Sequence, residues 1–151
     1  MTEYKSIPSE IPYKKVFLDT MPLIYFLDDD VHFGQACKNI FEEILGNERQ
    51  IVTSVITVME YLVYPYRTGN QEKMLAMHEF MYNCGINAVP INFAIANGAA
   101  EIRAKYPSFK AMDSLQLAAA CYSDCDLFLT NDKQLKQFDG IKCITVEEWN
   151  N

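Results

Sequence analysis

Residues 15–27, Lys-Val-Phe-Leu-Asp-Thr-Met-Pro-Leu-Ile-Tyr-Phe-Leu, decide the fold, because a strand, an isolated carboxylate and a helix follow one another directly. The run at 15–18 is typical of a short β-strand, and Pro22 favours the start of a helix that reaches about Leu27. Asp19 is the only charge between Lys15 and Asp28. A buried carboxylate costs several kcal/mol unless it is paired, neutralised or bound to a metal. The stretch therefore indicates an α/β fold with a carboxylate at the end of its first strand.

Two further carboxylates stand alone in apolar surroundings. Glu60 is the only charge in the 16 residues from Ile51 to Tyr66. Asp113 opens a helix-like stretch that reaches Cys121 with no other charge. Three such costs in one small chain predict a shared purpose, which is to bind a common cation.

Outward from the first stretch, short apolar runs alternate with helical patterns. We expect strands at 15–18, 50–53, 86–90, 127–129 and 141–144. We expect helices at 22–27, 33–46, from Ser54 to a kink or end near Pro65, at 71–83, 92–105, from Asp113 onward and, briefly, from Asp132. Thr145 and Glu148 form a capping-box pattern. This alternation is typical of a parallel sheet that is covered by helices on both faces.

The parallel sheet gives the acids a common place. Sites in open α/β sheets form beyond the carboxyl ends of the strands. Asp19 ends the first strand, and Asp132 follows the fourth by two residues; Glu60 and Asp113 lie on the helices between them. We therefore predict that these four carboxylates converge and bind one or two Mg²⁺ or Mn²⁺ ions, which prefer oxygen ligands.

Each acid also has a purely structural explanation. Asp19 could cap the following helix, and Asp113 could be a first-turn acid that the helix dipole favours. Asp132 could belong to an ordinary polar turn. Glu60 is the hardest to explain in this way, because it stands mid-helix. The basic residues that could pair with it are Arg67 and Lys73.

Composition limits the class of protein. The chain has 151 residues and is half hydrophobic, which suits one domain. It has no apolar run long enough to span a membrane and no apolar N-terminal core of the signal-peptide kind. Its five cysteines favour reduced, packed thiols in a cytoplasmic protein. Cys121 and Cys125 could share a helix face, but no second pair completes a zinc site.

Four short motifs occur in order along the chain: Val-Phe-Leu-Asp-Thr at 16–20, Thr-Ser-Val-Ile-Thr-Val-Met-Glu at 53–60, Ala-Met-Asp-Ser-Leu-Gln-Leu-Ala at 111–118, and Phe-Leu-Thr-Asn-Asp at 128–132. Together they resemble the four acidic motifs of the PIN-domain ribonucleases, most of all the small toxins of the VapC type. The resemblance spans roughly Lys15 to Trp149. Met21 stands where members of that family often carry Asn or Ser.

This resemblance implies a three-layer α/β/α fold with a central five-stranded parallel sheet. It implies a single PIN-like nuclease domain at 15–149, after an N-terminal extension at 1–14, and Mg²⁺- or Mn²⁺-dependent cleavage of RNA. It further implies a homodimer and a separately encoded antitoxin as partner. The implied metal ligands are Asp19, Glu60, Asp113 and Asp132, and the residues supporting them are Thr20, Thr130 and Asn131.

Such chemistry predicts that a metal-activated water attacks the phosphorus, leaving a 5′-phosphate and a 3′-hydroxyl. His32 and His78 lie far from the motifs and are expected at the surface. A non-catalytic PIN module used for assembly is the main alternative, and DNA cleavage is another. An aspartyl-phosphate phosphatase would need a second Asp at position 21, where this chain has Met21.

Basic residues near the last two motifs are candidates for gripping the substrate, since a net charge of −7 disfavours broad nucleic-acid binding. These are Arg103, Lys105, Lys110 and Lys133. Tyr106 and Phe109 could stack on an unpaired base. Equally, the two rings could fold onto the core.

Overall fold

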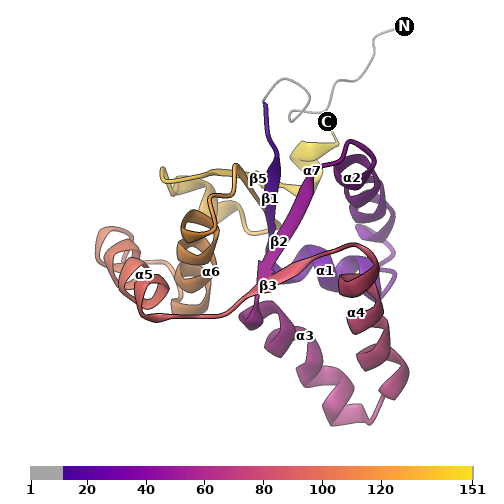
Figure 1. Cartoon of the computed structure of the whole chain (residues 1–151). Coiled ribbons are helices and arrows are strands. Elements are labelled where there is room, and N and C mark those ends of the chain that lie inside the picture. The colour runs from indigo at the N-terminus through magenta and orange to yellow at the C-terminus, as the bar shows by residue number, and fades with distance from the viewer. Residues whose placement is uncertain (1–11, 151) are drawn as a thin grey trace, which may run out of the picture.

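The structure is a computed structural model that describes residues 12–150, and its centre is a five-stranded, entirely parallel sheet in the order β3-β2-β1-β4-β5 (Figure 1). The strands are β1 (Lys15–Leu18), β2 (Gln50–Ser54), β3 (Asn87–Val89), β4 (Leu127–Thr130) and β5 (Lys142–Thr145). The expected strands and the predicted α/β/α fold are confirmed.

Helices cover both faces of the sheet. They are α1 (Thr20–Leu27), α2 (Gly34–Gly46), α3 (Val55–Thr68), α4 (Gln71–Asn83), α5 (Phe93–Lys105), α6 (Ala111–Tyr122), the 3₁₀ helix η2 (Lys133–Gln137) and α7 (Val146–Trp149). In Figure 1, α5 and α6 lie on one side of the sheet, and α1, α2 and α4 lie on the other. The strands β1 and β2 run downward in this view, so their carboxyl ends face the lower part of the molecule.

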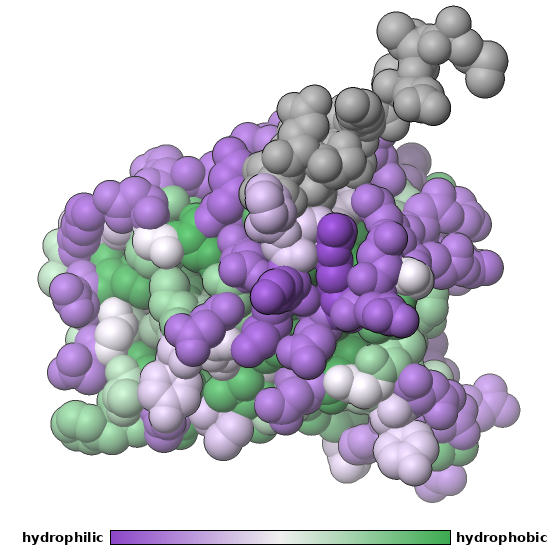
Figure 2. All heavy atoms as spheres, turned by 45° about the horizontal axis from the view of Figure 1, so that its top comes forward, coloured by the Kyte–Doolittle hydropathy of each residue, from purple (hydrophilic) through white to green (hydrophobic). Residues whose placement is uncertain are grey.

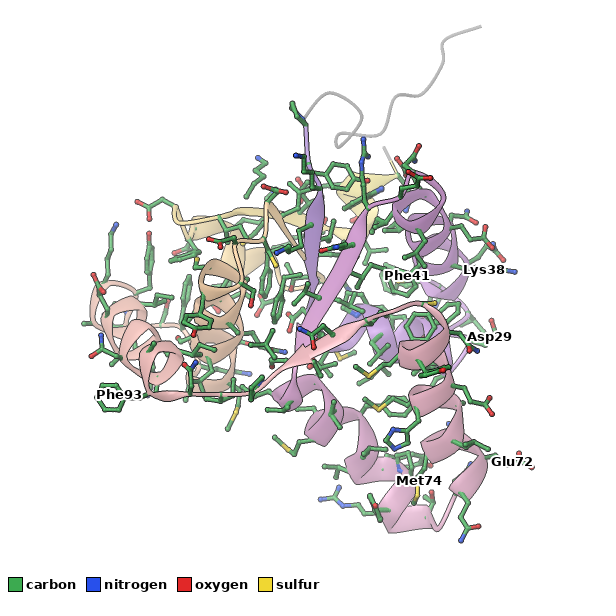
Figure 3. All side chains as sticks on the ribbon, in the orientation of Figure 1. Asp29, Lys38, Phe41, Glu72, Met74 and Phe93 are labelled. Atoms are coloured by element: carbon green, nitrogen blue, oxygen red, sulfur yellow. The ribbon has the colours of Figure 1, made fainter. Side chains whose placement is uncertain are left out.

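Two hydrophobic cores follow from the two-residue period of a strand. Val16 and Leu18 of β1 point into the core with α1, α2, α4 and α7, whereas Phe17 points into the core with α5 and α6. In Figure 3, Phe41 points from α2 toward α4, where its ring lies 5.6 Å from that of Phe80. The strands β1, β2, β4 and β5 are therefore mostly buried on both faces, which explains why their sequences are largely apolar rather than alternating, whereas the edge strand β3 is only partly buried.

The boundaries of two helices differ from those expected. α1 begins at Thr20 rather than Pro22, because the Asp19 carboxylate caps it by accepting from the Thr20 backbone N–H. α3 continues through Pro65 to Thr68 and ends at Gly69, whose φ of 67° is a left-handed conformation that glycine adopts without strain. The expected capping box at Thr145 and Glu148 is present.

Other predictions about the whole chain have separate outcomes. Most of the predicted extension, residues 1–11, lies outside the described residues. Within residues 12–150, no helix is long and apolar enough to cross a membrane. The five cysteines are free thiols; Cys37 and Cys143 are buried, but Cys121 is exposed, so the expectation of packed cysteines is wrong there. Cys121 lies in the last turn of α6 and lines a cavity together with residues of α5.

Candidate functional site

Asp19 is held by both of its carboxylate oxygens at the point where β1 passes into α1. Its backbone N–H donates to the Leu129 carbonyl at 3.0 Å, which continues the pairing of β1 with β4. Its Oδ1 accepts from the Thr20 backbone N–H at 2.9 Å, and its Oδ2 accepts from the Thr130 hydroxyl at 2.8 Å. The side chain is only 8% exposed. The carboxylate therefore has a fixed orientation before any ligand binds.

Burial raises the pKa of Asp19 to about 6, from an ordinary value of 3.8. The hydrogen bonds from Thr130 and Thr20 oppose this rise, and the negative charges of Asp113 and Glu60 add to it. The carboxyl group thus sits in an environment that penalises its ionised form. A positive ion beside it would remove that penalty.

This shift predicts how stability depends on pH without metal. Between about pH 4 and 6 the unfolded chain has Asp19 ionised while the folded protein keeps it protonated, so the free energy of unfolding falls as pH rises. In chelator, we expect the melting temperature of the wild type to fall more steeply from pH 4 to 7 than that of Asp19→Asn. Identical slopes in both proteins would contradict the raised pKa.

Glu60 lies in the second turn of α3, which begins where Ser54 caps it. Its Oε1 accepts from the Thr20 hydroxyl at 3.0 Å, so α3 is tied to the start of α1 beside Asp19. The structural alternative of pairing with Lys73 is wrong, since Lys73 forms a salt bridge with Asp28 at 3.2 Å.

Asp113 and Asp132 complete the set from the other side of the sheet. Asp113 lies half-buried in the first turn of α6; burial and then the charge of Asp132 raise its pKa, while Lys110 lowers it. Asp132 caps η2 by accepting from Gln134, and its own N–H donates to the Thr130 hydroxyl at 3.0 Å. The Thr130 hydroxyl therefore links Asp19 directly to Asp132.

One cavity of about 450 Å³ joins all four acids at the carboxyl ends of the strands. Its lining also includes Thr20, Met21, Ile24, Lys110, Ala111, Met112 and Thr130. Four segments that are far apart in the sequence thus meet at the carboxyl end of the central strand β1, which lies between β2 and β4. Figure 2, which brings the opposite end of the molecule forward, shows mostly hydrophilic residues there.

The expectation of three buried acids is wrong in part. Asp19 is buried, Asp113 is half-buried, and Glu60 is exposed, as is Asp132. Glu60 stands alone in an apolar stretch because its neighbours Met59 and Val63 are themselves exposed, at 47% and 38%. An uncharged stretch around an acid therefore did not mean that the acid is buried.

The donor set fits a hard divalent cation in its chemistry, since carboxylate oxygens are the ligands that Mg²⁺ and Mn²⁺ prefer. The arrangement is open rather than closed: among residues 12–150, no three Asp, Glu, His or Cys side chains already lie close enough together to hold an ion. Asp19 and Asp113 offer the least exposed carboxylates, and Glu60 and Asp132 lie on the rim.

The predicted basic residues are not all brought to this cavity. Lys110 lines it. Lys105 instead forms a salt bridge with Asp139 at 3.0 Å, beside a different cavity. Lys133 lines a separate hollow, and Arg103 is exposed on α5.

The two loop aromatics fold onto the core, which is the second of the two alternatives that the sequence left open. The Tyr106 and Phe109 rings stack on each other with centroids 4.8 Å apart, and Phe109 is 2% exposed. The Tyr106 hydroxyl donates to Asp139 at 3.0 Å.

Asn131, predicted to support the acids, donates instead to the Tyr25 hydroxyl at 3.0 Å. His32 and His78 are exposed, as expected.

Sequence reasoning missed Gln116 and Thr57, which hydrogen-bond to each other at 2.8 Å. The Thr57 hydroxyl lies 3.3 Å from that of Thr20. Both side chains are buried. The available signal was Gln116 itself, a large amide in the apolar stretch from Leu115 to Ala120.

Comparison with known proteins agrees with this fold. The PIN domain family matches residues 16–141, and the chain therefore belongs to this family. No curated protein matches the sequence significantly.

Several solved structures share the fold at low sequence identity. VapBC2 from Rickettsia felis, bound to a DNA fragment from its promoter, is 14% identical with a TM-score of 0.72, over 87% of this chain and 98% of that one. A toxin–antitoxin complex from Klebsiella pneumoniae is 21% identical with a TM-score of 0.69, over 87% and 97%. VapC20 from Mycobacterium tuberculosis, a toxin that cleaves the sarcin-ricin loop, is 13% identical with a TM-score of 0.61, over 84% and 98%.

Proposed function

We propose that this protein is a metal-dependent endoribonuclease and the toxin of a toxin–antitoxin pair. The single observation that carries the proposal is the cavity at the carboxyl ends of the strands, which four carboxylates from four separate segments line. Family membership and the fold shared with VapBC toxins support it.

Asp19, Glu60, Asp113 and Asp132 would hold one or two Mg²⁺ or Mn²⁺ ions. Such ions lower the pKa of bound water and stabilise the charge that develops on a phosphate. Thr130 and the Thr20 backbone N–H keep the Asp19 carboxylate aimed into the cavity. Because water is the attacking group, the products would carry a 5′-phosphate and a 3′-hydroxyl.

Cleavage of a labelled RNA in Mn²⁺, in Mg²⁺ and in chelator tests this proposal, followed by mapping of the product ends. Ends with a cyclic phosphate, or cleavage that persists in chelator, would contradict metal-assisted attack by water. A protein that binds RNA or another protein but cuts nothing would favour the alternative, a non-catalytic PIN module. The same assay with single-stranded DNA shows whether the protein cleaves DNA as well as RNA.

Lys110 is the basic residue that we propose to contact a substrate phosphate, because it lines the cavity. Lys110→Ala should weaken RNA binding and lower the slope of log affinity against log salt by about 0.7, the value for one lost contact to a single strand. Arg103→Ala is the matched control, since Arg103 is exposed on α5 and does not line the cavity. Equal slopes for Lys110→Ala and the wild type would place the contact elsewhere.

A homodimer would explain the apolar face of α3. Val55, Met59 and Val63 recur every four residues and are 41%, 47% and 38% exposed, and Tyr66 continues the face at 70%. A contiguous exposed apolar face of this kind is typical of a protein–protein interface. We assign it to a second copy of the chain, which the molar mass in solution would test, and a separately encoded antitoxin would bind to another surface.

A further inference from the structure

A row of buried polar side chains leads through hydrogen bonds to one of the four acids, Glu60. It consists of Ser54 at the start of α3, Gln116 in α6, Thr57 in α3 and Thr20 in α1. Their exposed fractions are 0%, 1%, 0% and 6%. Buried polar groups are tolerated when they are hydrogen-bonded, and each of these is. The row ends at Glu60, which the Thr20 hydroxyl contacts at 3.0 Å.

The orientation of the Gln116 amide is determined by Ser54. The Ser54 oxygen accepts from the Ile56 backbone N–H at 3.1 Å, in the capping bond of α3. Its single proton is then available for the Gln116 carbonyl oxygen, with which it is paired. Since the Ser54 hydroxyl donates to the amide oxygen of Gln116, that oxygen faces Ser54 and the amide nitrogen faces Thr57 and Thr20.

The amide nitrogen in turn orients the threonine hydroxyls. It donates to the Thr57 hydroxyl oxygen at 2.8 Å and lies 3.5 Å from that of Thr20. The two hydroxyl oxygens are 3.3 Å apart. With a donor on their inner side, the Thr20 oxygen acts as an acceptor there and its proton points outward to Glu60. The hydrogen bonds of the row thus all donate in one direction, from Ser54 at the cap of α3 to the Glu60 carboxylate in the cavity.

Glu60 needs such a contact more than Asp19 does. Asp19 is buried and held by Thr130 and the Thr20 backbone, neither of which involves Gln116. Glu60 is exposed on a helix surface, where a long side chain samples several rotamers. The hydrogen bond from Thr20 restricts it to the cavity side.

We propose that Gln116 is a positioning residue, which acts through the Thr20 hydroxyl to hold Glu60 toward the cavity and so raises the affinity of the site for a divalent cation. This inference rests on the proposed function, because it takes the four acids to be metal ligands. Groups that orient a metal ligand typically change affinity by about ten- to a hundredfold when they are replaced.

The test is the affinity of the purified protein for Mn²⁺. It is measured by calorimetry and by the decrease of the electron paramagnetic resonance signal of free Mn²⁺ when the ion binds. Gln116→Met keeps the length of the side chain but removes both ends of the amide. We expect it to bind Mn²⁺ about tenfold more weakly than the wild type. Ser114→Ala is the matched control: it removes a fully buried hydroxyl of the same helix that bonds only to the Lys110 carbonyl. Ser114→Ala should keep the wild-type affinity.

A double-mutant cycle separates positioning from a general structural effect. If Gln116 acts through Thr20, then Gln116→Met should cause no further loss of Mn²⁺ affinity in a Thr20→Val background. An equal loss in both backgrounds would overturn the proposal. Should Gln116→Met not fold, Gln116→Asn retains an amide that is one methylene too short to reach both partners, and is expected to show the same weakening.

The outcomes distinguish this inference from the proposed function. Wild-type Mn²⁺ affinity in a folded Gln116→Met or Gln116→Asn protein overturns the positioning role alone. A wild-type protein that binds no Mn²⁺ overturns the proposed function, and the positioning role with it.

Discussion

Asp19→Asn is expected to lower divalent-dependent RNA cleavage by at least about a hundredfold, because it removes the charge of the buried carboxylate in the cavity, which we propose as a metal ligand. Asn has nearly the same shape, so the cap of α1 and the contact with Thr130 remain available. The measurement is the initial rate of cleavage of a labelled RNA at saturating Mn²⁺, with circular dichroism to verify the fold.

The same substitution should stabilise the protein when metal is absent. At neutral pH, folding places an ionised Asp19 in an environment that raises its pKa to about 6, and an amide carries no such penalty. In chelator at pH 7.5, we therefore expect a higher melting temperature for Asp19→Asn than for the wild type. Excess Mn²⁺ should reverse that order, because it stabilises only the protein that binds it.

Asp139→Asn is the matched control for both effects. Asp139 is an exposed carboxylate paired with Lys105, beside a cavity other than that of the four acids. The variant makes the identical chemical change at a different place and should cleave RNA at the wild-type rate. If Asp19→Asn also cleaves at the wild-type rate, the proposed mechanism is wrong, whatever the stability data show.

The largest expected effect on stability belongs to Phe128→Ala in the central strand β4. Phe128 is 0% exposed, and its ring stacks on that of Phe17 with centroids 5.3 Å apart and planes 5° from parallel. Removing a buried phenyl ring typically costs about 3–5 kcal/mol, because it loses both burial and packing. For a chain of this length, that lowers the melting temperature by about 6–20 °C. Thermal unfolding by calorimetry provides the measurement.

Phe93→Ala is the control for that prediction. Phe93 is 88% exposed at the start of α5 and projects away from the molecule in Figure 3. Truncation of an exposed side chain usually changes the free energy of unfolding by no more than about 0.5 kcal/mol. A similar loss of stability in both variants would mean that the core between the sheet and α5–α6 is not packed as described.

The four acids could be found from the sequence because each signal is local. A carboxylate directly after an apolar strand, as at Asp19, must lie near the end of that strand whatever the rest of the chain does. Asp132 is placed by the same reasoning after β4. The sequence did not predict equally well which acids are buried, as Glu60 shows. Apolar residues next to it in the sequence are exposed on α3 rather than packed around the acid.

The substrate-binding residues could not be predicted in this way, because sequence proximity to a motif does not fix the direction of a side chain. Lys105 and Lys110 are both close to Asp113 in the sequence, yet only Lys110 lines the cavity. Lys105 ends α5 and pairs with Asp139 instead. Two residues along a helix are enough to turn a side chain to roughly the opposite side, because successive residues are about 100° apart.

The alternation of strands and helices, the parallel sheet and the positions of the four acids near the strand ends could be predicted from the sequence, since these depend on periodicity and on charges along one stretch. The hydrogen bonds that hold the acids, and the buried polar side chains that contact them, depend on tertiary packing. Thr130 reaches Asp19 from a neighbouring strand, and Gln116 reaches Thr20 and Thr57 from a helix that packs near the end of β2. Such hydrogen bonds join residues up to 111 positions apart, so no local pattern specifies them and only the packing of the elements brings the partners within reach.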